Sequence, residues 1–195
     1  MLLLCDWVLE STCQQSSARR GAGLKVPVLS VNASPLQFAQ PSFAQFALET
    51  LVRNDLPAGA IELAMTEGAL MADAPAAARK LAILRSAGVS LALDDFGSGY
   101  SSFGQLQRLP IDTLKIDKSF VCGENPASPA GAAILRAMAT MGASLRMRTI
   151  AEGVEGEAEL ARVRVAGCDI AQGFHFDRPL PAEEFARKLA VEKGS

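Results

Sequence analysis

The chain has little of what thiolate metal sites, disulfide frameworks and histidine chemistry need. Its 195 residues include four cysteines, no CxxC pair and a single histidine, His175. Cysteines so far apart in the sequence argue against structural zinc and against a disulfide framework. We expect Cys122 and Cys168 to be small buried residues, and His175 to be an ordinary rim or core histidine. The cysteine pattern is typical of a reducing compartment, so we expect the protein in the cytoplasm.

The chain also has no large charge excess and no long apolar run. There are 19 Lys and Arg residues against 21 Asp and Glu residues, which gives a net charge of -2. Because neither sign dominates, we expect no nucleic-acid polymer as a partner. The opening stretch MLLLCDWVLE lacks a basic region and is interrupted by Asp6 and Glu10, unlike a signal peptide. No segment reaches the roughly 20 apolar residues of a membrane span, so we expect no membrane contact from this segment.

The first residues instead predict an amphipathic helix over residues 2–20. The apolar positions that follow helical spacing there are Leu3, Leu4, Trp7, Val8 and Cys13. Such a stripe normally faces a core, so we expect Trp7 to be buried, and Phe103 likewise on a later helix.

Short apolar runs of β type alternate with helical patterns along the rest of the chain. Strands are expected over residues 26–34, 60–68, 89–97, 112–121, 148–154 and 168–176. Helices are expected over residues 42–54, 74–87, 130–146, 156–166 and 182–192. This alternation predicts a parallel α/β fold with both faces of the sheet covered. The strand count fits a TIM-like (β/α) barrel with about six of its eight strands. It also fits a doubly wound open sheet, although the chain has no GxGxxG fingerprint and no P-loop.

Polar side chains gather at the carboxyl end of each expected strand. In a parallel barrel these ends meet on one face, where such folds build their sites. We therefore expect a ring of acids at this face, together with amide side chains and a lysine. Its members are Asn32, Glu67, Asp94, Asp95, Lys115, Asp117, Glu152, Glu155 and Gln172.

Two adjacent acids, Asp94 and Asp95, stand between a strand and the loop GSGYSS. Neighbouring residues of a strand point to opposite faces, so both can face one site only if the strand breaks up there. The alternative is that one of them caps a turn or the next helix. Carboxylates that gather with Asn32, Lys115 and Glu152 repel one another unless cations neutralise them, which indicates Mg²⁺ or Mn²⁺. Two such ions at roughly 3.5–4 Å suit phosphodiester hydrolysis, because they clamp the attacking and leaving oxygens.

The residues of successive motifs indicate a protein family more specifically than the spacing of the polar positions does. The motifs are VNAS, MTEGALM, LALDDFGSGYSSFGQLQRLPIDTLKIDKSFV, TIAEGVE and GCDIAQGFHFDRPLPAEEF. In this order, and over essentially the whole chain, they resemble the EAL family, the bacterial cyclic di-GMP phosphodiesterase domain. The resemblance implies a TIM-like barrel that hydrolyses cyclic di-GMP to the linear dinucleotide pGpG with two Mg²⁺ or Mn²⁺ ions. It also implies a homodimer through the outer helices of the barrel.

Carried over position by position, the resemblance implies four metal ligands. Asn32, Asp94 and Glu152 match ligands of the family, and Asp95 matches a ligand of the second metal, directly or through water. The same match gives these residues one shared purpose, which is to hold cations.

Three further residues receive roles from the resemblance. Lys115 would orient the nucleophilic water, and Gln172 would complete the inner shell. Glu67 matches the glutamate that steadies the DDFGSGYSS loop, whose glycines would let the loop shift.

Two features depart from the family pattern. The Glu-Ala-Leu motif of the first strand, which supplies a metal ligand, has no counterpart, so residues 1–195 read as a single EAL-like domain without its N-terminal strands. In the strand before Glu67, the chain has Ala64 where the family has another acidic metal ligand. Glu62 points to the same face as Ala64 but lies roughly 6–7 Å down the strand, so we expect it not to substitute.

These departures predict weak metal binding, because each lost carboxylate removes a ligand and a charge from the site. We therefore interpret the chain as a degenerate, catalytically impaired EAL domain that acts as a cyclic di-GMP-binding or regulatory module. One alternative is an active phosphodiesterase, once a longer protein supplies the first strands. The other is a protein-interaction module that binds neither nucleotide nor metal.

Overall fold

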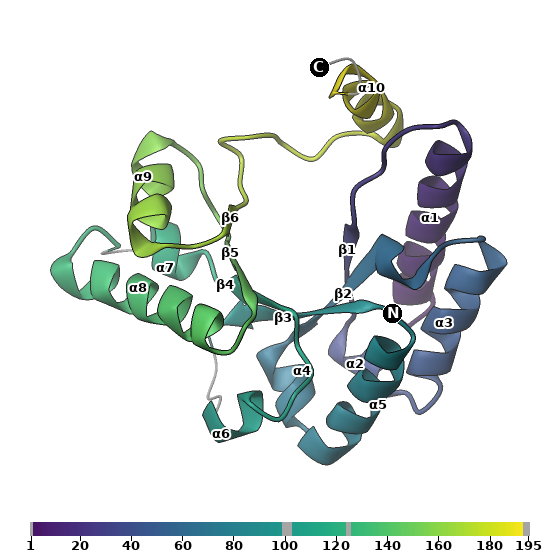
Figure 1. The fold of residues 1–195 in the computed structure, drawn as a ribbon, viewed down its shortest axis with the longest axis horizontal. Helices are drawn as coiled ribbons and strands as arrows, with labels where there is room; N and C mark the ends of the chain where they lie inside the picture. Colours follow the sequence, from purple (N-terminus) through teal and green to yellow (C-terminus); the bar gives the residue numbers. More distant parts are fainter. Residues whose placement is uncertain (1, 99–102, 124–125, 193–195) are drawn as a thin grey trace.

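The computed structural model describes residues 2–98, 103–123 and 126–192 of the chain. Within these ranges, six strands form one parallel sheet in the order β1-β2-β3-β4-β5-β6. The sheet curls and the helices surround its outer face, so the molecule is an incomplete barrel (Figure 1). The unbroken strand order excludes the doubly wound sheet, which needs a reversal of strand order and helices on both faces. The prediction of an α/β, TIM-like barrel with six strands is confirmed.

The strands are β1 (Leu29–Asn32), β2 (Ile61–Thr66), β3 (Ser90–Phe96), β4 (Thr113–Ile116), β5 (Arg148–Ala151) and β6 (Ile170–Ala171). The helices of the first half are α1 (Leu2–Gly21), α2 (Pro35–Ala39), α3 (Phe43–Arg53), the 3₁₀ turn η1 (Ala58–Ala60), α4 (Glu67–Met71) and α5 (Ala74–Ser86). The helices of the second half are α6 (Phe103–Leu106), α7 (Ser119–Cys122), α8 (Pro129–Ser144), α9 (Glu157–Ala166) and α10 (Ala182–Glu192).

Local sequence signals explain where several helices begin and end. Ser34, Asp73 and Ser128 cap α2, α5 and α8, because each side-chain oxygen accepts the backbone N–H three residues later. A proline in the first turn of each of these helices fixes a helical φ without losing a hydrogen bond. Gly167 ends α9 in the left-handed conformation (φ 83°) that glycine adopts without strain.

The strands are shorter than the apolar pattern suggests, because their polar carboxyl ends leave the sheet for the loops. The largest difference is at residues 168–176, where β6 contains only two residues. After β6 the chain turns onto the loop that follows β5, where the backbone N–H of His175 donates to the carbonyl of Val154 at 3.0 Å. That turn aims the residues after β6 at the carboxyl ends of the other strands.

Two hydrophobic clusters hold the curved sheet in shape. The larger joins the first strands to α1, α3 and α5, and the smaller joins β4 and β5 to α8 and α9. Fully burying one leucine or isoleucine contributes about 1.5–3 kcal/mol, so these clusters make the strands a rigid support for their carboxyl ends. The largest fully buried side chains include Leu9, Ile61, Leu63, Leu81, Leu91, Leu93, Leu114 and Ile116.

The amphipathic reading of the first helix is only partly right. α1 forms over Leu2–Gly21 and buries Leu9 and Cys13, but Trp7 is 62% exposed and Leu3 is 86% exposed. The prediction that Trp7 packs into the core is wrong, because α1 flanks β1, an edge strand with a neighbour on one side only. Its N-terminal half therefore has no further strand beneath it in the described part of the chain.

Two smaller expectations concern single side chains. Cys122 is exposed at the end of α7, so the prediction that it is buried is wrong, whereas Cys168 is half-buried and packs against the smaller cluster. The four-residue α7 is too short to cover its own last side chain. The side chain of Phe103 lies outside the described part of the structure.

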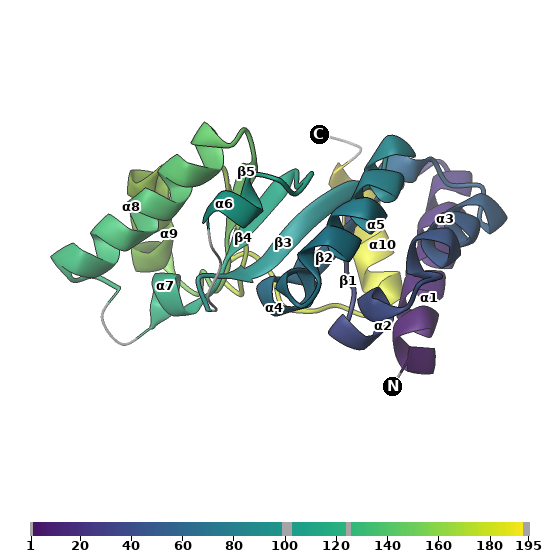
Figure 2. The same cartoon turned by 90° about the horizontal axis from the view of Figure 1, so that it is seen from below.

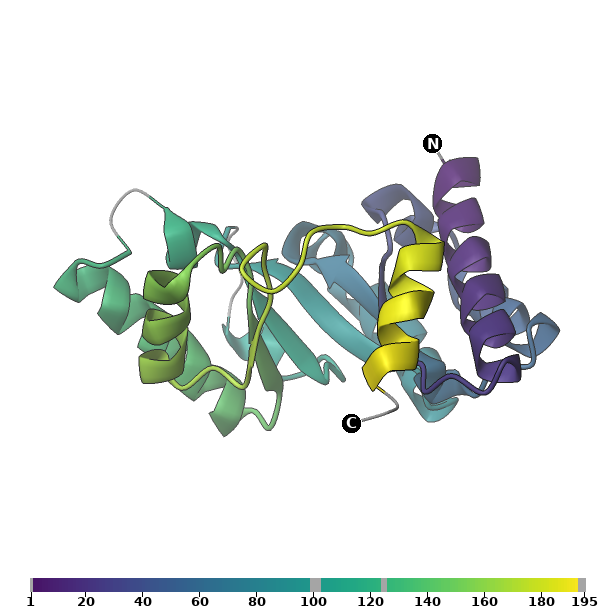
Figure 3. The same ribbon diagram turned by 90° about the horizontal axis from the view of Figure 1, so that it is seen from above.

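The C-terminal segment crosses the open side of the barrel between β6 and β1 (Figures 1 and 3). It ends in α10, which lies beside α1, and Arg19 Nη2 of α1 donates to the carbonyl of Ala182 at 2.6 Å. Figure 2 shows the same half-barrel turned by 90°, with α10 behind the sheet on the side of α1. Among the described helices, none has the length and apolarity that crossing a membrane would require.

Candidate functional site

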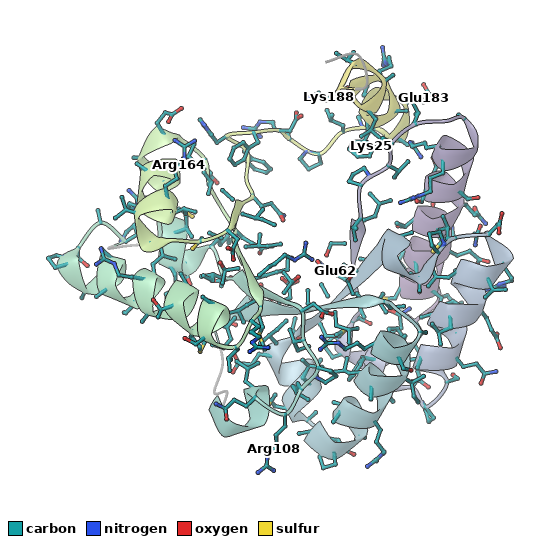
Figure 4. The ribbon with its side chains drawn as sticks, viewed as in Figure 1. Lys25, Glu62, Arg108, Arg164, Glu183 and Lys188 are labelled. Atoms are coloured by element: carbon teal, nitrogen blue, oxygen red, sulfur yellow. The ribbon has the colours of Figure 1, made fainter. Side chains whose placement is uncertain are left out.

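Strand register decides which side chains face the inside of the half-barrel. Parallel partners point to the same side, and Asn32 pairs with Ala64, which pairs with Ala92. Two residues further along β3, Asp94 is level with Thr66 of β2, so it shares this inner face. Figure 4 shows Glu62 on the concave side of the sheet, whereas Arg164 lies on the outer helix α9. The carboxyl ends of the strands thus present their polar residues to one inner rim.

A cavity of about 720 Å³ lies at this rim. Six of the seven residues that the sequence assigned to the site line it, and they come from five different strands or strand ends. They are Asn32, Asp94, Asp95, Lys115, Glu152 and Gln172. The seventh, Glu67, lies outside the cavity at the start of α4. Of the nine polar residues predicted for the ring, six thus line this cavity, whereas Glu67, Asp117 and Glu155 do not. The chemical role of each residue stays a prediction.

A bulge in β3 turns both adjacent acids into the site. The pairing of β3 with β4 shifts by one residue between Leu93 and Phe96, and Asp95 has a φ of 53°. A bulge inserts an extra residue and breaks the alternation of side chains, which is the strand disruption that two neighbouring inward acids require. Asp94, Asp95 and Glu152 each offer an oxygen, and these oxygens all lie within 4.8 Å of one another.

Lys115 ties two of these acids together. Its Nζ lies 2.7 Å from Asp94 Oδ1 and 2.6 Å from Glu152 Oε1, and its side chain is 7% exposed. Burial by itself would lower the pKa of Lys115, but hydrogen bonds and attraction from the two carboxylates raise the pKa above its ordinary value. The lysine is therefore charged, and it neutralises part of the acidic cluster.

The third acid of the cluster, Asp95, has no ion-pair partner of its own among the described residues and lies near other acids. Burial, together with repulsion from Asp94 and Asp117, raises the pKa of Asp95 above its usual range, although Lys115 and Lys118 oppose this. A carboxylate in such surroundings is stabilised by any cation that approaches it. The electrostatics of the rim thus favour cation binding at Asp95.

Glu67 braces the start of the loop that follows β3. Its carboxylate is buried, and Oε2 accepts a long hydrogen bond from the backbone N–H of Gly97 at 3.5 Å, while Oε1 has no partner among the described residues. Gly97 has a φ of 98°, and a Cβ there would meet Phe120 and Met138 at 2.6 Å, so only glycine fits. The loop-steadying role of Glu67 stays a prediction. The expected shift of the loop concerns residues 99–102, which lie outside the described part.

The second strand brings no carboxylate to the cluster. Ala64 is buried on the inner face of β2. Glu62, two residues earlier on the same face, is further from the carboxyl end of the strand, and its carboxylate already has partners. Glu62 accepts hydrogen bonds from Ser30 Oγ (3.1 Å) and Thr113 Oγ1 (2.6 Å), and it pairs with Arg148 Nη2 at 3.4 Å. Glu62 is therefore engaged below the cavity and does not line it.

One wall of the cavity was missed by sequence reasoning. It consists of residues from α1, and they are Leu4, Cys5, Val8 and Thr12. Leu4 and Val8 belong to the apolar stripe that the sequence predicts to face the core, whereas Cys5 and Thr12 lie outside that stripe and carry no signal for the site. They reach the cavity because the open side of the half-barrel leaves α1 next to the site. A smaller cavity of about 230 Å³ adjoins the site at Glu152 and Gln172, and Phe174 lines its outer side.

The donor set suits a hard divalent cation. Mg²⁺ and Mn²⁺ prefer oxygen ligands, and oxygens about 2.1 Å from one octahedral ion lie about 3–4.2 Å apart. The three carboxylate oxygens within 4.8 Å of one another need only small side-chain movements to meet that requirement. The three carboxylates thus fit one such ion, and that Asp94, Asp95 and Glu152 hold it stays a prediction.

Comparisons with known proteins agree with this geometry. The cyclic di-GMP phosphodiesterase NbdA of Pseudomonas aeruginosa is 39% identical over 187 residues, which are 94% of this chain and 24% of that protein. The bifunctional diguanylate cyclase/cyclic di-GMP phosphodiesterase MucR of the same species is 37% identical over 185 residues, which are 95% of this chain and 27% of MucR. The chain thus spans about a quarter of the length of these curated relatives.

Solved structures show the same fold. The PaMucR phosphodiesterase in complex with c-di-GMP superposes with a TM-score of 0.88 at 37% identity, over 94% of this chain and 74% of that chain. The EAL domain of Mycobacterium smegmatis DcpA gives a TM-score of 0.88 at 35% identity, over 95% of this chain and 83% of that chain. The sequence profile of the EAL domain family matches residues 1–179. With nine-tenths of its length matched, this chain belongs to the EAL domain family.

Proposed function

We propose that this chain binds cyclic di-GMP at the carboxyl-end cavity and hydrolyses it poorly, so that it acts as a binding or regulatory module. Support comes from the family, whose relatives include named cyclic di-GMP phosphodiesterases and a c-di-GMP complex. The cavity of about 720 Å³ is large enough for a ligand of this class, and its rim carries both hydrogen-bonding amides and carboxylates.

The observation that carries the impaired activity is Ala64. Its methyl group stands on the inner face beside Asn32, and Glu62 below it is held by Thr113 and Arg148. The cluster thus has three carboxylates and a lysine, with no acid from β2. Because phosphodiester hydrolysis with two metal ions depends on charge stabilisation at both oxygens, fewer anionic ligands reduce its rate by orders of magnitude.

The residues at the rim have different roles in the proposed binding. Asp94, Asp95 and Glu152 would hold a divalent cation, which when bound supplies a Lewis acid for the phosphate. Lys115 keeps its proton at Nζ and is placed to orient a water molecule beside Asp94 and Glu152. Asn32 and Gln172 are exposed at the rim, where Asn32 would add its amide oxygen to the cation and Gln172 would complete the inner shell. Without a cation the three carboxylates repel a phosphodiester, so binding of nucleotide and cation is expected to be cooperative.

Two further parts of the proposal concern the setting of the domain. We infer a cytoplasmic location, because the four cysteines are free in the structure and the ligand class is a bacterial second messenger. A homodimer through the outer helices is also part of the proposal, and light scattering of the purified chain tests it.

The test is a calorimetric titration of the purified chain with cyclic di-GMP in Mn²⁺ buffer. The solution in the calorimeter cell is then analysed by chromatography to measure how much pGpG has formed. Saturable heat with intact cyclic dinucleotide is the expected result. Accumulation of pGpG would contradict the impaired activity. A folded chain that gives neither heat nor product would leave the protein-interaction module as the function.

The second candidate is an active phosphodiesterase that requires further strands from a longer protein. The retained cluster of Asp94, Asp95, Lys115 and Glu152 favours it. Turnover by a longer protein that contains this chain, and its loss after Glu152→Gln, would establish this second function.

A further inference from the structure

We propose that Gly173 and Val154 are positioning residues of the site, because their backbones form a close contact that fixes Glu152 and Gln172 relative to each other. The contact, which we call the clasp, joins the loop after β5 (residues 152–155) to the loop after β6 (residues 172–176). The inference rests on the proposed function for the chemistry of the site, and it concerns how two of the rim residues are held in place.

Two backbone hydrogen bonds close the clasp on Val154. The N–H of Val154 donates to the carbonyl of Gln172 at 3.0 Å, and the carbonyl of Val154 accepts from the N–H of His175 at 3.0 Å. Val154 thus uses both of its backbone polar groups on the loop after β6. Glu152 lies two residues before Val154, so these bonds set the position of Gln172 relative to Glu152.

Between these two bonds, Gly173 lies directly against the backbone of Val154. A Cβ on Gly173 would overlap the nitrogen and the carbonyl oxygen of Val154, and it would lie 2.6 Å from the carbonyl carbon. Backbone atoms cannot rotate out of the way as the end of a side chain can. Only glycine therefore lets the two loops approach so closely.

The loop after β5 is held from two other directions. The side chain of Val154 is fully buried in the smaller hydrophobic cluster. Gly153 has a φ of 77°, and a Cβ there would meet the Cβ of Lys118 at 2.6 Å, so this loop also packs tightly against the start of α7. Because closely packed groups do not yield easily, an extra atom at Gly173 would push the loop after β6 outward and move Gln172 with it.

The two residues that the clasp holds face the same ligand volume. Glu152 and Gln172 both line the cavity of about 720 Å³ and the adjoining cavity of about 230 Å³. Groups that support the ligands of a metal site typically change the metal affinity by about 10- to 100-fold when they are altered. Gly173 has no side chain to offer a cation, yet it determines how far Gln172 stands from Glu152.

The first experiment tests the clasp in the unaltered 195-residue chain. Hydrogen exchange followed by nuclear magnetic resonance measures the amides of Val154 and His175 in EDTA, and again in MgCl₂. We expect both amides to exchange at least about 100-fold more slowly than an unstructured peptide in either buffer. Exchange at the rate of an unstructured peptide, or protection that develops only with Mg²⁺, would overturn the proposal, and this measurement requires no variant.

The second experiment separates positioning from general stability. The chain is stripped with EDTA and titrated with MnCl₂, while electron paramagnetic resonance measures free Mn²⁺. We expect the dissociation constant for Mn²⁺ to rise by at least about tenfold in Gly173→Ala. The matched control is Gly142→Ala, whose Cβ would overlap the Cγ2 methyl group of Thr149 where α8 packs on β5, and Gly142 lines neither cavity.

The control should lose stability without losing the site. We expect both variants to have a lower Tm than the unaltered chain, and Gly142→Ala to change the dissociation constant for Mn²⁺ by less than about threefold. Circular dichroism establishes that each variant is folded. Equal losses of affinity in the two folded variants, or an unchanged affinity in folded Gly173→Ala, would show that Gly173 has a structural role only.

Cyclic di-GMP binding by the unaltered chain is measured separately, in MgCl₂. A chain that binds no nucleotide, but shows the protected amides and the effect of Gly173→Ala, would contradict the proposed function and leave the clasp standing. A chain that binds the nucleotide, but whose Mn²⁺ affinity is the same in Gly173→Ala, would do the reverse.

Discussion

Replacing Ala64 with glutamate should make the stability of the domain depend on divalent cations. Ala64 is 1% exposed, and its inner-face neighbours across the sheet are Asn32 and Ala92. The strand of Asp94 lies about 4.8 Å away, and Asp94 is two residues, or about 6.6 Å, further along. A glutamate side chain spans much of that distance, so its carboxylate would come within about 6 Å of the acidic cluster.

The magnitude follows from the charges on the rim. At an effective dielectric constant of about 20, two unit charges about 6 Å apart interact by about 3 kcal/mol. Three carboxylates repel the new charge and Lys115 attracts it, which leaves an excess of two repulsions. Side-chain movement and water relieve part of this, so we expect Ala64→Glu to lose about 3 kcal/mol without metal. For a domain of this size, that loss lowers Tm by about 6–12 °C.

Saturating Mn²⁺ should restore most of the free energy of unfolding that Ala64→Glu loses. A ligand at 100 times its dissociation constant stabilises a folded protein by about 2.7 kcal/mol, and a fourth carboxylate raises the affinity for the ion. The assay is thermal unfolding in EDTA and in Mn²⁺, with Ala64→Gln as the control of equal size and no charge. The reasoning is refuted if both variants lose the same stability in EDTA, or if Mn²⁺ raises the two Tm values equally.

Three other substitutions test separate parts of the structure. Glu62→Ala leaves the buried hydroxyl of Thr113 without its acceptor, so the free energy of unfolding in urea should fall by about 3 kcal/mol. Glu62→Gln should lower it by about half as much. Equal losses would show that the charge of Glu62 is unimportant there. Gly97→Ala forces a Cβ into a left-handed backbone and a contact of 2.6 Å, so its free energy of unfolding should fall by about 2 kcal/mol or more, and an unchanged value would contradict the fit. Hydrogen bonds from the backbone and side chain of Thr149 lower the pKa of Asp169. The charged form of Asp169 therefore stabilises the fold above about pH 4. This contribution is lost as the pH falls through the lowered pKa. Asp169→Asn should therefore cost about 0.5–1 kcal/mol at pH 7 and nothing near pH 2, and a pH-independent difference would contradict this linkage.

Much of the fold was available from the sequence because it depends on local signals. Apolar runs that alternate with helical patterns predicted six parallel strands, and the helices expected over residues 74–87 and 130–146 lie close to the observed α5 and α8. Polar residues at the carboxyl ends of the strands predicted one ring, because parallel strands all end on the same face. The structure places six of the seven predicted site residues around one cavity.

The sequence was less informative about boundaries and exposure. Trp7 follows the same helical spacing as buried residues of α1, yet it is exposed because the neighbouring strand β1 is an edge. Periodicity tells which residues share a face of a helix, but it does not tell what covers that face. The short β6 was mispredicted for a related reason, since an edge strand pairs only as far as its one neighbour continues.

The sequence by itself determined the α/β class, the family and the identity of the residues at the rim, because patterns and motifs are properties of neighbouring positions. Only the tertiary structure decided how those residues meet. The bulge at Asp95 turns two consecutive acids inward, and Lys115 reaches across to Asp94 and Glu152. Glu62 is held one step lower by partners from three other strands. These relations depend on register between strands distant in sequence, and register is set by the packing of the whole sheet.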